Sequence, residues 1–229
     1  MPQPTERADR ILDAAGELMI RLGYRKVTVE DVARQAGIGK GTVYLHWRTK
    51  EQLFESLILR SAREMITELA EKLRRDPAEI QPHRFLRSAF RATQRNPLLR
   101  ALVTSDVELL GSLTESPVRA REQDIANRYY ALITKHGLVR DDVPHLAYAI
   151  NASTLGFYTM SSLKPGVPEL DDESAADVLA HTVRHAFEPD DDPDPTLLVS
   201  AANEIADLFD DLDTSYREWI YGAPGNERG

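Results

Sequence analysis

Apolar residues recur every three to four positions along most of the chain, which is the spacing of α-helices with one buried face. The first apolar stripe consists of Ile11, Ala15, Leu18 and Leu22. Gly23 directly follows this stripe and is placed to end the helix. A longer stripe covers residues 50–74, and no segment has the sustained alternation of a β-strand. The pattern therefore predicts an all-α protein.

Prolines, glycines and charged runs divide the rest of the chain. The segment RRDPAEIQP ends the long helix with two prolines. Helical patterns then cover residues 83–95, 97–112, 118–136, 143–163, 172–187 and 196–221. We expect a three-helix domain over residues 1–50, joined by the long helix to a larger helical domain over residues 51–229. Within the larger domain we expect an acidic linker at 188–195 and an additional C-terminal helix at 196–221.

The composition narrows the chemistry and the surroundings of the chain. It has no cysteine, which excludes disulfides, thiolate metal sites and cysteine nucleophiles. The first ten residues lack the apolar stretch of a signal peptide. Residues 146–163 carry no charge, but they include too many Ser, Thr and Asn side chains for a membrane span. We therefore expect a cytoplasmic protein without membrane contact.

A stretch near the N-terminus has the steric pattern of two short helices joined by a tight turn. Thr28 and Asp31 have the spacing of a capping box, with Asp in place of the usual Glu or Gln. Ala33 is small where the two helices would cross, and Gly37 stands at the turn, where a positive φ is expected. Such a unit can lay its second helix in the major groove of DNA.

The expected second helix, at about Lys40–His46, carries residues suited to DNA rather than to helix stability. Gly39 and Gly41 lower helix propensity, but they let the backbone approach a phosphate closely. Lys40 offers a cation to phosphate or guanine, and Thr42 offers a hydroxyl and a methyl group to base edges.

Aromatic and basic residues continue this pattern to the next helix. Tyr44 and His46 have apolar bodies with hydrogen-bonding tips, which suits a wall of sugar and phosphate. Lys50 stands at the start of the following helix, an end that favours anions. Trp47 is instead expected to be buried as an apolar lid on that helix.

Charge is unevenly distributed along the chain. The formal net charge is −9, yet residues 1–50 hold nine Lys and Arg against six Asp and Glu. Residues 188–213 hold ten carboxylates and no Lys or Arg. Because local charge decides which partner a surface attracts, the N-terminal domain is expected to bind double-stranded DNA.

The run TVEDVARQAGIGKGTVYLHW, followed by KEQL, resembles the N-terminal domain of the TetR family of bacterial transcriptional regulators. The resemblance covers residues 8–57 and implies a helix-turn-helix domain followed by a helical domain for ligand sensing and dimerisation. It implies contacts with DNA for Thr28, Lys40, Gly41, Thr42, Tyr44, His46 and Lys50. Leu45 departs from members that carry an aromatic residue at this position, so no contact is assigned to it.

The resemblance favours a homodimeric repressor that binds a near-palindromic operator and is released by a small-molecule effector. Two alternatives remain open from the sequence: an activator of the same family, and a small-molecule-binding protein with a vestigial helix-turn-helix. The dimer interface is expected in a four-helix arrangement of 143–163 and 172–187 from each subunit. Its apolar stripe on the second of these helices consists of Ala176, Leu179, Val183, Ala186 and Phe187.

An effector site for a largely apolar or aromatic ligand is expected among the helices from 83 to 163. Aromatic walls and a few polar anchors are typical of such sites. The candidate residues are Phe90, Tyr129, Tyr130, Asn151, Thr154, Phe157 and Tyr158.

Two further patterns have less specific readings. His181 and His185 have an i, i+4 spacing that can bind zinc, but Thr182 stands where a metalloprotease carries its glutamate, so a surface or interface pair is favoured. The C-terminal segment has a heptad-like stripe of Leu198, Ala201, Ile205, Leu208, Leu212 and Trp219, and we expect it to dock onto the protein body.

The sequence contains no motif of an enzyme. It has no G-x-S-x-G, phosphate-binding loop or dinucleotide-binding fingerprint. The run EPDDDPDP lacks the glycine-containing loop of a calcium site and is favoured as a solvated linker. No catalytic residue, metal site or cofactor is therefore expected.

Overall fold

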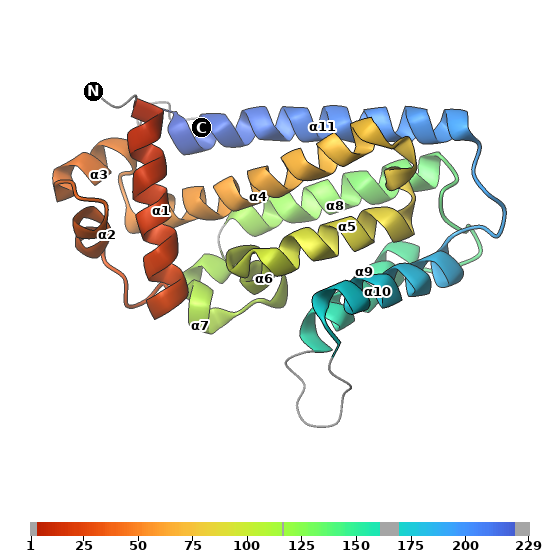
Figure 1. Ribbon diagram of the computed structural model, residues 1–229, viewed down its shortest axis with the longest axis horizontal. Helices are drawn as coiled ribbons and strands as arrows, with labels where there is room; N and C mark the ends of the chain where they lie inside the picture. Colours follow the sequence, from red (N-terminus) through yellow and green to blue (C-terminus); the bar gives the residue numbers. More distant parts are fainter. Residues whose placement is uncertain (1–3, 116, 161–169, 223–229) are drawn as a thin grey trace. The chain divides into compact units, whose positions relative to one another are not determined.

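The computed structural model describes residues 4–115, 117–160 and 170–222. Within these ranges the chain contains no β-strand, which confirms the all-α prediction (Figure 1). The helices are α1 Pro4–Leu22, α2 Val29–Gln35, α3 Lys40–His46, α4 Lys50–Arg75, α5 Pro82–Arg95, α6 Pro97–Thr104, α7 Val107–Leu110, α8 Pro117–Lys135, α9 Leu146–Met160, α10 Asp172–Phe187 and α11 Pro195–Tyr221. Two 3₁₀ helices, Pro77–Ile80 and Gly111–Glu115, follow α4 and α7. No helix of the described part is long and apolar enough to cross a membrane.

Most helix bounds follow the predicted ones closely. The predicted helix 97–112 is instead divided into α6 and α7, because Ser105 adopts a left-handed φ of 54°. Asp106 then starts α7, since its carboxylate accepts hydrogen bonds from the amides of Glu108 and Leu109 at 3.0 Å. The end of the predicted helix 143–163 lies outside the described residues.

The chain forms two compact units. Unit 1 comprises Met1–Glu64, Pro97–Arg119 and Leu212–Gly229, and unit 2 comprises Met65–Asn96 and Ala120–Asp211. The helix-turn-helix segment therefore belongs to a unit that also includes α6, α7 and the end of α11. Helices α4, α8 and α11 each contribute residues to both units.

The core of unit 1 is built on the apolar faces of α1 and α4. Ile11, Leu12 and Phe54 are fully buried. Leu22 was predicted to share this face, but it is 40% exposed, because the buried face turns to Met19 in the last turn of α1. Gly23 ends the helix with φ 76°, as predicted.

Unit 2 is a bundle in which α5 packs along α10, and α10 lies beside α9 (Figure 1). The apolar faces of these helices supply its core. Phe90 of α5 and Leu179 and Val183 of α10 are fully buried. Outside this core, arginines of α5 pair with carboxylates of α10, as Arg87 does with Asp177 at 2.6 Å.

Helix α11 buries one face, as predicted, but that face follows the ordinary helical period rather than heptads. Ala201, Ile205 and Phe209 are buried, whereas the predicted Leu208 and Leu212 are only half-buried and Trp219 is 44% exposed. Within unit 2, Lys135 pairs with Glu204 at 2.8 Å and Arg74 with Asp210 at 2.5 Å. Within unit 1, Tyr221 donates to Asp9 at 2.5 Å. The acidic face of this helix is therefore partly neutralised by other helices.

Candidate DNA-binding interface and effector site

Helix α2 begins with the predicted capping box. The Thr28 hydroxyl oxygen accepts from the Asp31 amide at 3.1 Å, and the Asp31 carboxylate accepts from the Thr28 amide at 3.0 Å. The Thr28 hydroxyl also donates to Asp31 at 2.6 Å, and these bonds hold the pKa of Asp31 below its ordinary value. Thr28 is an exposed residue at the start of α2.

The turn between α2 and α3 has the predicted geometry. Gly37 adopts φ 67°, and the Ile38 amide donates to the Ala33 carbonyl at 3.0 Å. Ala33, Val32 and Val43 are all buried, so small and apolar side chains seal the two short helices together. Local steric requirements therefore fix how α3 projects from α2.

The remaining face of α3 is open. Lys40 has a side chain that is 53% exposed, with Glu30 3.8 Å away. Gly41 is exposed and has no side chain within 4 Å of the position that a Cβ would occupy. Tyr44 is 42% exposed and Leu45 is 70% exposed, while Thr42 is half-buried. The face thus combines a cation, a hydroxyl group and apolar surface around a glycine.

The sequence pattern assigns no DNA contact to Leu45. An apolar side chain that is 70% exposed on the open face of α3 is suited to contact the methyl group of thymine. Its spacing of four from Gly41, on the same face, was the available signal.

His46 and Trp47 lie at the end of α3. Burial and the positive charge of Arg7 lower the pKa of His46, so its imidazole is mostly neutral at pH 7. Trp47 is 3% exposed and donates from its indole nitrogen to the Ser56 hydroxyl at 2.9 Å. The expectation that Trp47 is a buried lid on α4 is confirmed.

Lys50 is half-buried and engaged within unit 1. Its ammonium donates to the Tyr24 carbonyl at 2.6 Å and lies 4.1 Å from the centre of the Tyr24 ring. Burial lowers the pKa of Lys50. The Tyr24 hydroxyl in turn donates to Glu51 at 3.0 Å. Lys50 therefore ties the first turn of α4 to the loop that follows α1.

The predicted effector residues gather on α5, α8 and α9 of unit 2. The rings of Phe90 and Tyr158 are 4.8 Å apart, and Tyr130 donates to Asn151 at 2.8 Å. Tyr129 stacks at 4.5 Å on Phe85, an aromatic residue that the prediction did not include. Burial raises the pKa of Tyr130 and of Tyr158 to about 12. Thr154 and Phe157 are half-buried on α9.

The predicted dimer stripe lies mostly inside the protomer. Ala176, Leu179 and Val183 are fully buried and Phe187 is 7% exposed, because α10 packs this face against α5. Only Ala186 of the stripe is exposed. A surface for a second copy on α9 and α10 therefore has to use their opposite faces.

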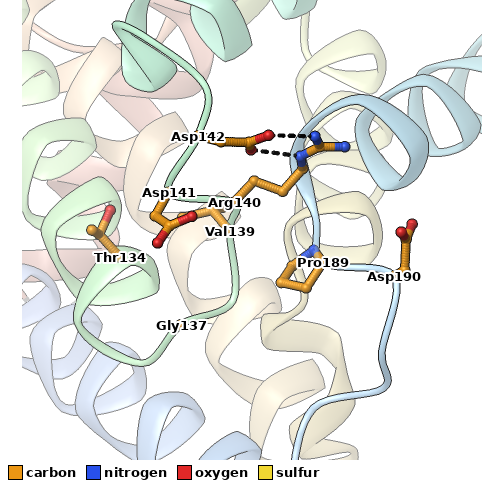
Figure 2. A pocket seen from close by; sticks show the side chains of 8 residues that line it. All are labelled: Thr134, Gly137, Val139, Arg140, Asp141, Asp142, Pro189 and Asp190. Atoms are coloured by element: carbon orange, nitrogen blue, oxygen red, sulfur yellow. Dashed lines mark hydrogen bonds and ion pairs between the residues drawn. The ribbon is translucent and has the colours of Figure 1, made fainter.

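A hollow of about 570 Å³ opens at the C-terminal end of α8 (Figure 2). It is lined by Thr134, Gly137, Val139, Arg140, Asp141, Asp142, Pro189 and Asp190, none of which is a predicted effector residue. The Arg140 guanidinium is paired with the Asp142 carboxylate at 2.7 Å. Three carboxylates around one paired arginine make this hollow unsuited to anions.

His181 and His185 lie on the exposed face of α10, with ring centres 4.1 Å apart. The described residues contain no group of three or more potential metal ligands.

Comparisons with known proteins identify the N-terminal domain. Residues 11–57 match the model for bacterial regulatory proteins of the tetR family. An uncharacterised HTH-type transcriptional regulator of Bacillus subtilis, YhgD, is 25% identical over 145 residues, covering 62% of this chain and 76% of that protein. Alignments with several further regulators cover less than half of those proteins' length.

Solved structures share the fold over most of the chain. A TetR-family regulator from Mesorhizobium loti has a TM-score of 0.54 at 17% identity, covering 82% of this chain and all of that one. AibR in complex with isovaleryl coenzyme A and operator DNA has a TM-score of 0.50 at 20% identity, covering 77% and 97%. Residues 11–57 are therefore a helix-turn-helix domain of the TetR family, and the chain is a DNA-binding transcriptional regulator.

Proposed function

We propose that this TetR-family regulator is a cytoplasmic, ligand-responsive repressor. In this proposal it binds a near-palindromic operator as a homodimer and is released when a small-molecule effector binds its helical domain. The observation that carries the proposal is the open face of α3, where Lys40, Gly41 and Tyr44 are exposed around a fixed turn. Gly41 lowers the helix propensity of α3, and its open surroundings would let the helix backbone approach a phosphate closely.

Within the interface we assign two kinds of contact. Lys40 and Thr42 lie at the start of α3 and are proposed to reach base edges. Thr28, Tyr44 and His46 are proposed to hold phosphate and sugar, with Gly41 allowing the backbone to approach closely. Lys50 is expected from the sequence in the same set, but in this structure its ammonium donates to the Tyr24 carbonyl, so we propose that it positions α4 instead of neutralising a phosphate.

The proposed mechanism is an equilibrium between two states. Two recognition helices bind successive major grooves when they are about 34–36 Å apart. An effector releases the operator only if it binds more tightly to a state with a different spacing. Helix α4 begins at the helix-turn-helix segment and ends in unit 2, which makes it the candidate element for transmission.

For the homodimer we propose the outward faces of α9 and α10. Tyr148 and Leu155 of α9 are 77% and 45% exposed, and Val178 of α10 is 45% exposed. Apolar side chains at helical spacing on two neighbouring helices are typical of a surface that a second copy covers. The proposal keeps the two helices expected from the sequence and replaces the buried stripe by these residues.

The test uses duplexes from the DNA upstream of the protein's own gene, with a scrambled duplex of the same composition. Lys40→Ala is expected to weaken binding to the first by about 1–3 kcal/mol per direct base contact and to relax the preference at one position per half-site. Tyr44→Phe is expected to lose about 0.5–1.5 kcal/mol without relaxed preference, since it removes one hydroxyl. Failure of the wild-type protein to prefer any upstream duplex over the scrambled one would overturn the proposal.

A further inference from the structure

Three buried polar atoms in unit 2 find no hydrogen-bond partner among the described residues. They are the Gln94 Oε1, Tyr129 hydroxyl and Thr154 hydroxyl atoms. Leaving such an atom unpaired in the interior costs about 1–3 kcal/mol each, so native cores rarely keep three of them without a reason. A ligand that supplies the missing partners is one such reason.

Contacts among α5, α8 and α9 give the order of these three residues along the bundle. Phe85 of α5 stacks on Tyr129, and the adjacent Tyr130 bonds Asn151, so these four residues lie at one level of the bundle. Further along both helices, Phe90 of α5 meets Tyr158 of α9. Helices α5 and α9 therefore run in the same direction.

This direction sets the order of the unpaired atoms. Thr154 lies between the level of Asn151 and that of Tyr158 on α9. Gln94 lies one turn beyond Phe90 on α5. Because an α-helix rises 1.5 Å per residue, the distance along α5 from the level of Tyr129 to Gln94 is about 13 Å. The order along the bundle is therefore Tyr129, Thr154 and Gln94, with the contact of Phe90 and Tyr158 between the first and the last. The amide nitrogen of Gln94 donates to Asp172 of α10 at 2.9 Å, so the unpaired oxygen belongs to a side chain already held in place.

The charges around this interior oppose an anion. Among the described residues of unit 2, the charged side chain of Glu188 is buried, with 4% of its surface exposed. Its carboxylate accepts from the His83 amide at 2.5 Å and lies 2.8 Å from the His83 ring. Burial, together with the nearby Tyr130 and the negative charge of Glu188, raises the pKa of Tyr129. Arg184 lies 3.9 Å from the same carboxylate, so the cation nearest the Tyr129 end is already paired with Glu188.

The arginines of α5 are not available to an anion either. Arg84 pairs with Asp76 at 2.6 Å and Glu79 at 2.7 Å, and Arg95 pairs with Glu68 at 2.6 Å. Arg87 and Arg91 share Glu173 at 2.8 Å. A phosphate or carboxylate entering here would have to displace one of these ion pairs.

We propose that the effector is an elongated, uncharged molecule with hydrogen-bonding groups at both ends, and that this site rejects acyl-CoA and other anionic ligands. The inference rests on the proposed effector response and names the chemical class of the effector. A donor group at one end meets the amide oxygen of Gln94, and a hydroxyl or carbonyl group at the other meets the Tyr129 hydroxyl. A flat apolar middle takes the place of the contact between Phe90 and Tyr158.

Substitutions of two adjacent tyrosines test whether the Tyr129 hydroxyl lacks a hydrogen-bond partner in the unliganded protein. Tyr129→Phe removes an unpaired buried hydroxyl, so Tm of the unliganded protein is expected to rise by about 2–4 °C. Tyr130→Phe removes a hydroxyl that donates to Asn151, so Tm is expected to fall by a similar amount. A fall for both variants would show that the Tyr129 hydroxyl is already satisfied and would overturn the inference.

Ligand class is tested by melting curves and calorimetry with three probes. Para,para′-biphenol is uncharged with a hydroxyl at each end, and biphenyl-para,para′-dicarboxylate has the same shape with two negative charges. The third probe is isovaleryl-CoA. Biphenol is expected to raise Tm and to bind about 3- to 10-fold more weakly to Tyr129→Phe than to wild type. The inference would be overturned if either anion raised Tm more than biphenol does. It would also be overturned if none of the three probes raised Tm.

Operator titrations with the same proteins separate this inference from the proposed function. If the wild type binds an upstream duplex but biphenol neither stabilises it nor weakens that binding, the ligand class is wrong and the regulator stands. If no upstream duplex is bound, the proposed function fails, while the melting curves still decide the ligand class.

Discussion

At the residue scale, a contact with a residue distant in the sequence changes the role expected for the Lys50 side chain. Its position at a helix start predicts a phosphate contact, but its ammonium binds the carbonyl of Tyr24, which is 26 positions earlier. Lys50→Ala is therefore expected to destabilise the protein by about 1.5–3 kcal/mol, the range for a hydrogen bond to a charged group. Urea denaturation measures this loss.

The salt dependence of DNA binding separates this role from a phosphate clamp. For Lys50→Ala, the slope of log affinity against log salt is expected to stay as in wild type. A slope smaller by about 1 per half-site, with unchanged stability, would show that Lys50 leaves Tyr24 and neutralises a phosphate. Lys40→Ala is the matched comparison, since Lys40 is exposed and its one described pairing is at 3.8 Å.

His46 gives operator binding a dependence on pH. Its pKa in the free protein lies below the ordinary value of 6.5, because burial and Arg7 disfavour the imidazolium. A nearby phosphate would favour the charged form and raise that pKa, so binding takes up a proton. Operator affinity is therefore expected to rise as the pH falls below about 6.5. Fluorescence anisotropy at pH 7.5 and 5.5 measures it, and His46→Gln is expected to remove most of the rise. An equal rise in both proteins would assign the effect to another group.

Not every residue could be placed from the sequence. The structural roles of Thr28, Gly37 and Trp47 could be predicted, because capping, a positive φ and a buried lid on the next helix depend on residues close in the sequence. The sequence predicts that Glu188 belongs to a solvated acidic run, yet it is buried against His83, which is 105 positions away. The residues next to Glu188 in the sequence do not indicate a hydrogen-bond partner so far away in the chain.

At the element scale, the two glycines of the helix-turn-helix have opposite expected effects. Gly37 has φ 67°, so Gly37→Ala is expected to destabilise the domain by about 1–2 kcal/mol. Gly41 is inside α3 with open space around it, so Gly41→Ala is expected to stabilise the domain by up to about 1 kcal/mol. If α3 approaches DNA closely at this point, the same substitution weakens operator binding. Thermal melts and operator titrations of both variants check these outcomes. A stabilised Gly41→Ala that binds the operator normally would show that no close approach occurs there.

Helical periodicity identified the apolar faces of the elements but not what covers them. Periodicity predicts the stripe on α10 as a dimer surface, but in the structure this stripe packs against α5 of the same chain. On α11 the predicted heptads differ from the buried face, because a straight helix docked on a body follows a period of 3.6 residues. By contrast, α3 was predicted with its bounds, since its start and end depend on adjacent residues.

At the scale of the whole molecule, the proposed dimer requires that one apolar surface of each protomer stays free until a second copy covers it. The inner face of α10 does not meet this condition, because Leu179 is fully buried. The outer faces of α9 and α10 do, since Leu155 and Val178 are each 45% exposed. In a two-fold interface each substitution is present twice, so two changes introduce four charges.

The double substitution Leu155→Asp and Val178→Asp is therefore expected to convert the dimer into a folded monomer. Light scattering after size exclusion measures the mass, and circular dichroism checks that the helices remain. Leu179→Asp is the control, because a carboxylate in the core is expected to cost at least about 3 kcal/mol and to unfold unit 2 rather than yield a folded monomer. If the outer-face variant remains a dimer with intact helices, the interface lies elsewhere, and the partly exposed residues of α11 become the next surface to substitute. Operator binding should fall together with the dimer, since a single recognition helix loses the contacts of the second half-site.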